Sequence, residues 1–390
     1  MRELVELAGA REALDPQRVI RALAETFERW RAPHSAERAR LAREHGVFSP
    51  EVVDRGVRLA LQAWTAESLT ALRARELSDP CWVPPVTAVW LAGSIPTAAF
   101  SALALPLLAG SSVYAKPASA DPVSARLFAA SLGETDPAVG AALRVGTDAK
   151  ALDDADAVVA HGSDATIAAL RARVGARPFV GYGHKVSLAV IGPSIDPLVA
   201  GRRLALDVAL WDGRGCLSPA WALAVDSPRG RAAEVARALA GAFEELEDDL
   251  PRGALDPAEA SELVELRARA AVRDGTRLEM AAGSSTWTVA LESSDARPPA
   301  GVFRFLSVVP VADVESVAGF CAPLAPHLSC VGHAGLAGER SRLAALAASA
   351  GASRLCPLGR MQTPPLDWNH DGLPPLRSLV RWLDVEGSDL

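Results

Sequence analysis

Cys216 is the residue of this chain best suited to covalent chemistry. It stands in a polar loop, Trp211 to Pro219, that carries two glycines and lies between a helical run and an apolar strand. A thiolate attacks carbonyl carbon readily, and a neighbouring cation such as Arg214 favours the thiolate form. A lone cysteine is nevertheless more often a small buried hydrophobic side chain. The surrounding sequence must decide between these two interpretations.

A second candidate site lies at the start of a helix. A short apolar strand, residues 157–160, runs into Gly162 and Ser163 and then into a helix ending at Val174. Free backbone N–H groups and the helix dipole make such a turn favourable for phosphate. An ordinary capped helix start has the same sequence pattern. From the residues alone, both interpretations stay open.

Two further patterns are weaker. His327, Cys330 and His333 place ligand types at every third position, but on a strand Cys330 points away from both histidines, so we expect no metal site. Gly181 and Gly183 form a Gly-x-Gly that is common in β turns and is weak evidence for a nucleotide site.

Composition limits the class of protein. The chain has 390 residues with a net charge of −7, which favours two or three globular domains and argues against a nucleic-acid surface. Its five cysteines are an odd number without Cys-x-x-Cys spacing, so neither a disulfide framework nor a zinc ribbon is indicated. A reducing, cytoplasmic setting is expected, and the N-terminus does not resemble a signal peptide.

One stretch is long enough to span a bilayer. Residues 82–115 contain no charged side chain. Prolines and glycines interrupt the stretch at Pro84, Pro85, Gly93, Pro96, Pro106 and Gly110. They divide it into strand, turn and helix, so we expect a buried core unit and no membrane span.

The elements that must position these residues alternate along most of the chain. Residues 1–80 show helical periodicity with arginine-rich opposite faces. Beyond them, strands are expected at 86–92, 111–115, 157–160, 178–182, 186–191, 220–225, 285–291, 303–311 and 328–332. Helices are expected at 97–109, 122–132 with Asp121 as its cap, 164–174, 197–210, 228–250, 256–274 and 338–349. This alternation predicts βαβ units and mainly parallel sheets, two of them for this length.

Six segments in order resemble one family, the NADPH-dependent acyl-CoA reductases related to the fatty-acid reductase of bacterial luminescence, within the aldehyde dehydrogenase superfamily. They are LAGSIP at 91–96, AKPAS at 115–119, HGSD at 161–164, FVGYGHKVS at 179–187, GCLSP at 215–219 and PLGRMQ at 357–362. The resemblance implies an aldehyde dehydrogenase-like α/β fold, with a Rossmann-type cofactor domain and an α/β catalytic domain. The expected bounds are 1–185 for the helical N-terminal region and NADPH-binding domain, 186–355 for the catalytic domain, and 356–390 for a tail returning to the active-site side.

The resemblance also implies roles for individual residues. Cys216 stands where the superfamily has its nucleophile. Lys116 stands where the family contacts the adenosine ribose or its 2′-phosphate, and an ammonium group suits that role. Gly162 and Ser163 match the turn that meets the cofactor phosphates, which favours the phosphate interpretation of that turn.

Three positions concern the fate of the acyl group. Gly181 replaces the Glu that activates water in aldehyde-oxidising members, so hydrolysis of an acyl-enzyme is disfavoured. Ser94 replaces an Asn that donates to the oxyanion. His184 is a candidate to hold the thiolate or donate a proton, with packing as the alternative. A Glu often found at the nicotinamide ribose is missing near residues 303–305.

The function implied is NADPH-dependent reduction of an acyl thioester, acyl-CoA or acyl-carrier, to an aldehyde through an acyl-cysteine. The alternatives are a cysteine thioesterase without hydride transfer, an acyl-phosphate reductase, and a non-catalytic family member. A homodimer is expected by analogy with the superfamily.

Overall fold

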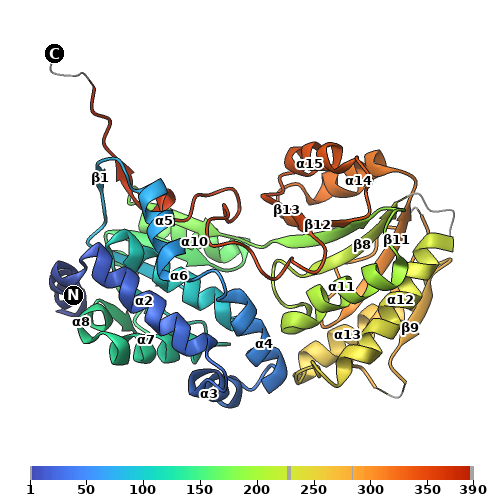
Figure 1. The fold of residues 1–390 in the computed structure, drawn as a ribbon, viewed down its shortest axis with the longest axis horizontal. Coiled ribbons are helices and arrows are strands. Elements are labelled where there is room, and N and C mark those ends of the chain that lie inside the picture. The colour runs from blue at the N-terminus through green and yellow to red at the C-terminus, as the bar shows by residue number, and fades with distance from the viewer. Residues whose placement is uncertain (1, 226–229, 283, 295, 387–390) are drawn as a thin grey trace. The chain divides into compact units, whose positions relative to one another are not determined.

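The computed structural model describes residues 2–225, 230–282, 284–294 and 296–386. The chain divides into two compact units (Figure 1). The first unit comprises Met1–His45, Ala60–His184 and Pro365–Leu390, and the second comprises Gly46–Leu59 and Lys185–Pro364. The division between His184 and Lys185 is one residue from the predicted boundary. Residues 46–59 belong to the second unit, although the predicted first domain includes them. The predicted tail, 356–390, is divided between the two units after Pro364.

Among its described residues, the first unit contains a five-stranded parallel sheet in the order β4-β3-β2-β5-β6. The strands are β2 (Val86–Trp90), β3 (Ser112–Lys116), β4 (Leu143–Val145), β5 (Ala157–His161) and β6 (Phe179–Tyr182). The first four residues of β2, β3 and β5 are all buried, which explains their continuous apolar runs. A two-stranded antiparallel pair joins β1 (Cys81–Trp82) to β14 (Arg381–Trp382).

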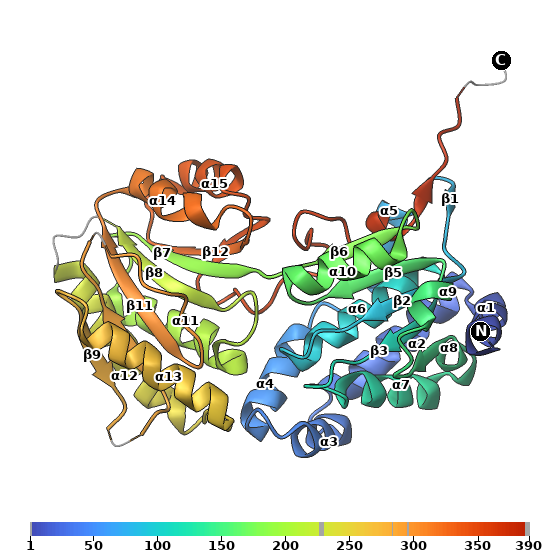
Figure 2. The same cartoon turned by 180° about the vertical axis from the view of Figure 1, so that it is seen from behind.

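Helices cover this sheet. They are α1 (Arg2–Ala10), α2 (Pro16–Arg31), α3 (Ala36–His45), α5 (Ala66–Glu76), α6 (Pro96–Ala109), α7 (Ser124–Thr135), α8 (Pro137–Ala141), α9 (Ala151–Asp154) and α10 (Asp164–Val174). The apolar α6 is buried between β2 and β3 on one side and α2 and α7 on the other, while α10 lies along β5 and β6 (Figure 2). The uncharged stretch 82–115 is therefore strand, helix and strand. No helix in the described ranges is long and apolar enough to cross a bilayer.

The described part of the second unit contains a seven-stranded sheet in the order β13-β12-β7-β8-β11-β10-β9, parallel except for β9. The strands are β7 (Val186–Ile191), β8 (Pro219–Val225), β9 (Arg277–Met280), β10 (Thr288–Leu291), β11 (Phe305–Val311), β12 (Leu328–Ala334) and β13 (Arg354–Pro357). The helices are α11 (Pro197–Ala209), α12 (Gly230–Glu247), α13 (Pro257–Ala271), α14 (Val314–Cys321) and α15 (Arg340–Ser349). Side chains of α14 and α15 pack with those of β7, β8 and β11 into one large core.

Helix α4 (Pro50–Ala60) belongs mostly to the second unit, although it lies in the N-terminal region of the sequence. Gly56 faces the indole of Trp211, and a Cβ at this glycine would lie 2.4 Å from the ring. The ring of Phe48 meets Trp211 edge-on at a centroid distance of 5.3 Å. The segment 46–59 therefore packs against the loop that carries Cys216.

The structure differs from the predicted elements in several details. The helix expected from Pro122, with Asp121 as its cap, begins at Ser124, because the Asp121 carboxylate accepts the N–H groups of Val123 and Ser124 in a turn that precedes it. The antiparallel edge strand β9 was not predicted. The helix expected at 228–250 is α12, and residues 228–229 lie outside the described residues.

Candidate active site

Cys216 is half-buried in a tight turn between a short 3-10 helix (η2, Leu210–Gly213) and β8. The Ser218 N–H donates to the Gly215 carbonyl at 2.9 Å and closes the turn. The Ser187 hydroxyl donates to the Cys216 carbonyl at 2.6 Å. The nucleophile candidate thus lies on backbone that is fixed from both β7 and its own loop.

The loop before Cys216 is strained and held by a buried ion pair. Trp211 and Asp212 have φ values of 66° and 53°, and Phe303 and Arg304 have 53° and 63°. The Arg304 guanidinium lies 2.7 Å from the Asp212 carboxylate, with both side chains almost fully buried. Left-handed backbone at such residues persists only where the surroundings enforce it. Breaking a buried pair costs about 3–5 kcal/mol, so this pair strongly opposes relaxation of the loop.

Arg214 has a partner within the second unit. Its Nη2 donates to Glu259 Oε2 at 2.9 Å, and the guanidinium lies 4.9 Å from the Phe303 ring centroid. The hydrogen bond from Arg214 is the largest effect that lowers the pKa of Glu259. The Arg214 charge is therefore largely neutralised by Glu259, which weakens the expected electrostatic effect on the Cys216 thiol.

The predicted cofactor residues Lys116, Gly162 and Ser163 share one edge of the first unit's sheet with the predicted catalytic residues Ser94 and His184. Ser94 follows β2, Lys116 ends β3, Gly162 and Ser163 follow β5, and His184 follows β6. These strands are adjacent and parallel, so all five residues lie at the carboxyl edge. This is the edge at which ligands bind in open parallel sheets.

Two loops meet at this edge. A Cβ on Gly93 would lie 3.0 Å from the Ala120 side chain and 3.1 Å from the Asp121 nitrogen, so the loop that carries Ser94 packs closely on the turn after Lys116. Ser94 itself is exposed. Lys116 Nζ lies 3.9 Å above the ring centroid of Trp90, which orients the ammonium group.

The capped helix start is confirmed at Ser163, and the phosphate interpretation of the same turn stays a prediction. The Ser163 side chain accepts the Thr166 N–H at 3.2 Å and caps α10. A Cβ on Gly162 would lie 3.2 Å from Thr166, so the glycine keeps the approach to the helix open. The cap occupies one donor of the first turn, and a first turn has several N–H groups without intrahelical partners. The remaining donors suit a phosphate.

Neighbouring residues restrain Gly181 and the backbone of His184. A Cβ on Gly181 would lie 2.7 Å from the Phe179 ring and 2.8 Å from Ile167. Any side chain at this position would have to displace Phe179 and Ile167. The His184 backbone N–H donates to Asp164 at 2.9 Å, while its side chain is exposed.

Residues 14–382 match the family described as acyl-CoA reductase (LuxC). The chain belongs to this family. It is an oxidoreductase that reduces an acyl thioester to an aldehyde. Among curated proteins, no sequence matches this chain.

Solved structures place the reductase in the aldehyde dehydrogenase fold. An oxidoreductase from Marinobacter aquaeolei is 14% identical with a TM-score of 0.77, covering 97% of this chain and 89% of that chain. The aldehyde dehydrogenase KauB from Pseudomonas aeruginosa is 15% identical with a TM-score of 0.76, covering 98% and 88%. An indole-3-acetaldehyde dehydrogenase with bound NAD+ is 16% identical with a TM-score of 0.75, covering 98% and 88%. At these identities the likeness shows the fold.

Sequence reasoning missed a stack of rings in the reductase's first unit. His161 stacks on Tyr182 at 4.7 Å, Tyr182 on His370 at 4.4 Å, and His370 on Trp368 at 4.9 Å between centroids. Burial, with a smaller contribution from the His370 charge, lowers the pKa of His161 to about 3. The stack anchors the C-terminal segment to the carboxyl ends of β5 and β6. No periodicity connects residue 161 with residue 370 in the sequence.

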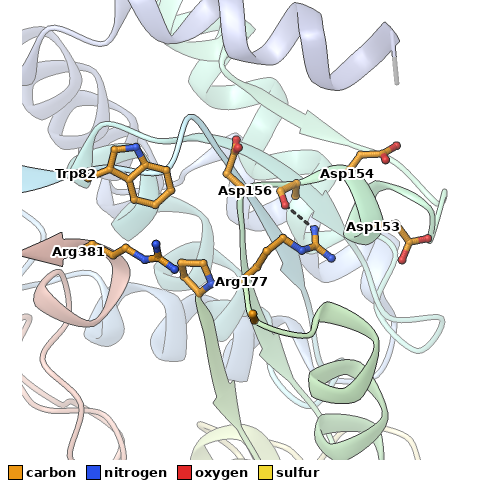
Figure 3. Close-up of a pocket in the computed structure, with 9 residues that line it drawn as sticks. Trp82, Asp153, Asp154, Asp156, Arg177 and Arg381 are labelled. Carbon is orange, nitrogen blue, oxygen red and sulfur yellow. Dashed lines mark hydrogen bonds between the residues drawn. The ribbon is translucent and has the colours of Figure 1, made fainter.

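A hollow of about 430 Å³ lies at the opposite, amino edge of the reductase's first sheet (Figure 3). Trp82, Asp156, Arg177 and Arg381 are among its lining residues. The Arg177 guanidinium donates to two backbone carbonyls at 2.6 and 2.8 Å, so its hydrogen bonds stabilise the loop around α9. This hollow is separate from the predicted cofactor edge.

Proposed function

We propose that the reductase forms the aldehyde through an acyl-enzyme on Cys216, with NADPH as hydride donor. The observation that carries the proposal is the hydrogen-bonded turn at Cys216, together with Gly181, a position where a side chain would have to displace Phe179 and Ile167. Such a site favours transfer of the acyl carbon to sulfur and disfavours its hydrolysis. The acyl donor is a CoA or acyl-carrier thioester, and the assembled form is a homodimer.

In the proposed reaction the Cys216 thiolate attacks the thioester carbonyl. A bond forms between sulfur and carbon, the carbon–sulfur bond of the carrier breaks, and the carrier leaves as a thiolate that takes up a proton. The Cys216 backbone N–H and the Ser94 hydroxyl stabilise the oxyanion during this exchange. His184 holds the thiolate or donates the proton that the leaving carrier takes up. After reduction, the bond between the acyl carbon and the Cys216 sulfur breaks, which releases the aldehyde and restores the thiolate.

The residues at the carboxyl edge fit a dinucleotide. Gly162 keeps the start of α10 accessible to phosphate, and Lys116 offers a cation oriented by Trp90. When bound, the nicotinamide supplies the hydride that reduces the acyl carbon on sulfur. Lys116 next to the adenosine ribose favours NADPH over NADH, because its ammonium pairs with a 2′-phosphate.

The test measures NADPH oxidation with a panel of acyl-CoA and acyl-carrier thioesters, with acyl phosphates as a comparison. Wild type is expected to oxidise NADPH, to release aldehyde and to carry an acyl adduct in mass spectrometry. Cys216→Ser is expected to lose the adduct and the activity, whereas the control Cys81→Ser, at another partly exposed cysteine, keeps both. An adduct that persists on another cysteine would contradict the nucleophile, and free acid as the product would contradict the reduction.

A further inference from the structure

The segment from Pro357 to Thr363, here named the C-terminal strap, is held from two sides within the second unit. The buried Asp207 carboxylate on α11 accepts the N–H groups of Gly359 at 2.6 Å and Met361 at 3.0 Å. The Arg354 guanidinium donates to the Met361 carbonyl at 2.6 Å. The Asp207 carboxylate thus binds N–H groups of the strap, and the Arg354 guanidinium binds one of its carbonyls. These charge-assisted hydrogen bonds fix the path of the strap.

The strap directs one side chain at the nucleophile turn. Gln362 Nε2 donates to the Asp207 carbonyl at 2.8 Å and to Ser218 Oγ at 2.9 Å. Gln362 and Ser218 are each 6% exposed. An amide nitrogen has two N–H groups, so both donors are used in a buried place where an unused donor would cost free energy.

Ser218 transmits this restraint to the backbone of the nucleophile. Its N–H donates to the Gly215 carbonyl. That carbonyl and the Cys216 N–H belong to the same planar trans peptide, in which the two groups point in opposite directions. The direction of the Cys216 N–H is therefore set by the bond that Ser218 makes. The bond from Ser187 to the Cys216 carbonyl restrains the following peptide.

We infer that Gln362 is a positioning residue, which acts through Ser218 to aim the Cys216 N–H at the oxyanion of the thioester carbonyl. This inference rests on the proposed role of Cys216. An oxyanion donor acts only when it lies within hydrogen-bond distance of the developing charge, so a small rotation of the peptide weakens catalysis.

A purely structural role and a positioning role differ in the reactions they affect. Acylation of Cys216 by a thioester passes through an oxyanion and needs the N–H. Alkylation by iodoacetamide displaces iodide at a saturated carbon and forms no oxyanion, so it reports the exposure and thiolate content of the same sulfur. Positioning predicts slower acylation with unchanged alkylation.

The experiment compares Gln362→Met, which keeps the volume and removes the donors, with wild type in single-turnover acylation followed by mass spectrometry. The acylation rate constant is expected to fall by about 10- to 100-fold, with alkylation rate and thioester affinity unchanged. Thr363→Val is the matched control, because it removes a strap hydrogen bond, to the Arg360 carbonyl, that does not reach the turn. It is expected to acylate like wild type.

Ser218→Ala gives an independent check, since it leaves the Gln362 bond to Asp207 in place. It is expected to slow acylation similarly, and the double variant is expected to be no slower than either single variant. Additive effects, an equal fall in alkylation, or normal acylation in Gln362→Met would overturn the inference. Wild type that acquires no adduct on Cys216 would instead overturn the proposed function, and the inference with it.

Discussion

At the scale of single residues, Gly181 stands where the family resemblance places the Glu that activates water in aldehyde-oxidising members. The Phe179 ring and Ile167 occupy the space that a Cβ would need. A side chain here would have to displace Phe179 and Ile167, and under the proposed function the lack of a carboxylate at this position protects the acyl group from hydrolysis.

Substitution of Gly181 tests this interpretation. Gly181→Ala is expected to destabilise the protein by about 1–3 kcal/mol, because the added methyl group overpacks against the side chains of Phe179 and Ile167. Urea unfolding measures the change. Gly133→Ala in α7 is the control, since the described residues leave the space around its Cβ open and alanine favours helix by about 1 kcal/mol.

The same position allows a functional check. Gly181→Glu is expected to produce no gain of free acid from acyl thioesters, because the carboxylate cannot enter without displacing Phe179 and Ile167. Product analysis by chromatography separates acid from aldehyde. A variant that is stable and hydrolyses thioesters would show that the packing is not what excludes water chemistry.

At the scale of elements, α4 links the N-terminal region to the nucleophile loop. The close approach of Gly56 to Trp211 lets the helix lie directly on the indole, and Phe48 completes the contact. Trp211 in turn precedes Asp212, which pairs with Arg304. A short segment of the N-terminal region thereby supports backbone that is strained at four residues.

Gly56→Ala tests the contact between α4 and Trp211, because its effect can be told apart from that of helix propensity. Alanine in a helix is favourable by about 1 kcal/mol, so any loss of stability must come from the conflict with Trp211. We expect a net loss of about 1–3 kcal/mol and slower acylation of Cys216. Gly9→Ala in α1, which has open space in the described structure, is expected to stabilise. If Gly56→Ala behaves like Gly9→Ala in urea unfolding, α4 does not restrain the loop.

At the scale of the whole molecule, the residues proposed for cofactor binding and for acylation belong to two different units. Lys116, Gly162 and Ser163 belong to the first unit, and Cys216 with its supporting bonds belongs to the second. Each unit has its own sheet and its own core. Cofactor binding and acylation are therefore expected to respond to separate substitutions.

Lys116→Met tests this division. Loss of the charge is expected to weaken NADPH binding by about 10- to 100-fold, as for a charge-assisted contact, and to weaken NADH binding much less. Acylation of Cys216 by a thioester is expected to be unchanged. Fluorescence titration and mass spectrometry provide the two readouts. Equal loss of NADPH and NADH binding would contradict the contact with the 2′-phosphate.

The sequence by itself determined the alternation of elements, the parallel sheets and the family. Buried parallel strands require continuous apolar runs, and turns require glycine and proline, so the local sequence determines these features. The candidate residues Ser94, Lys116, Gly162 and His184 follow predicted strands, which is why their common edge was predictable.

Only the tertiary structure decided what supports Cys216. The pairing of Asp212 with Arg304, the contact of Gly56 with Trp211, and the bond from Gln362 to Ser218 join positions that are distant in the chain. Such contacts depend on how whole elements pack, and the partners show no shared periodicity or spacing. The nucleophile could therefore be recognised from its loop, whereas the restraints that aim it required the folded chain.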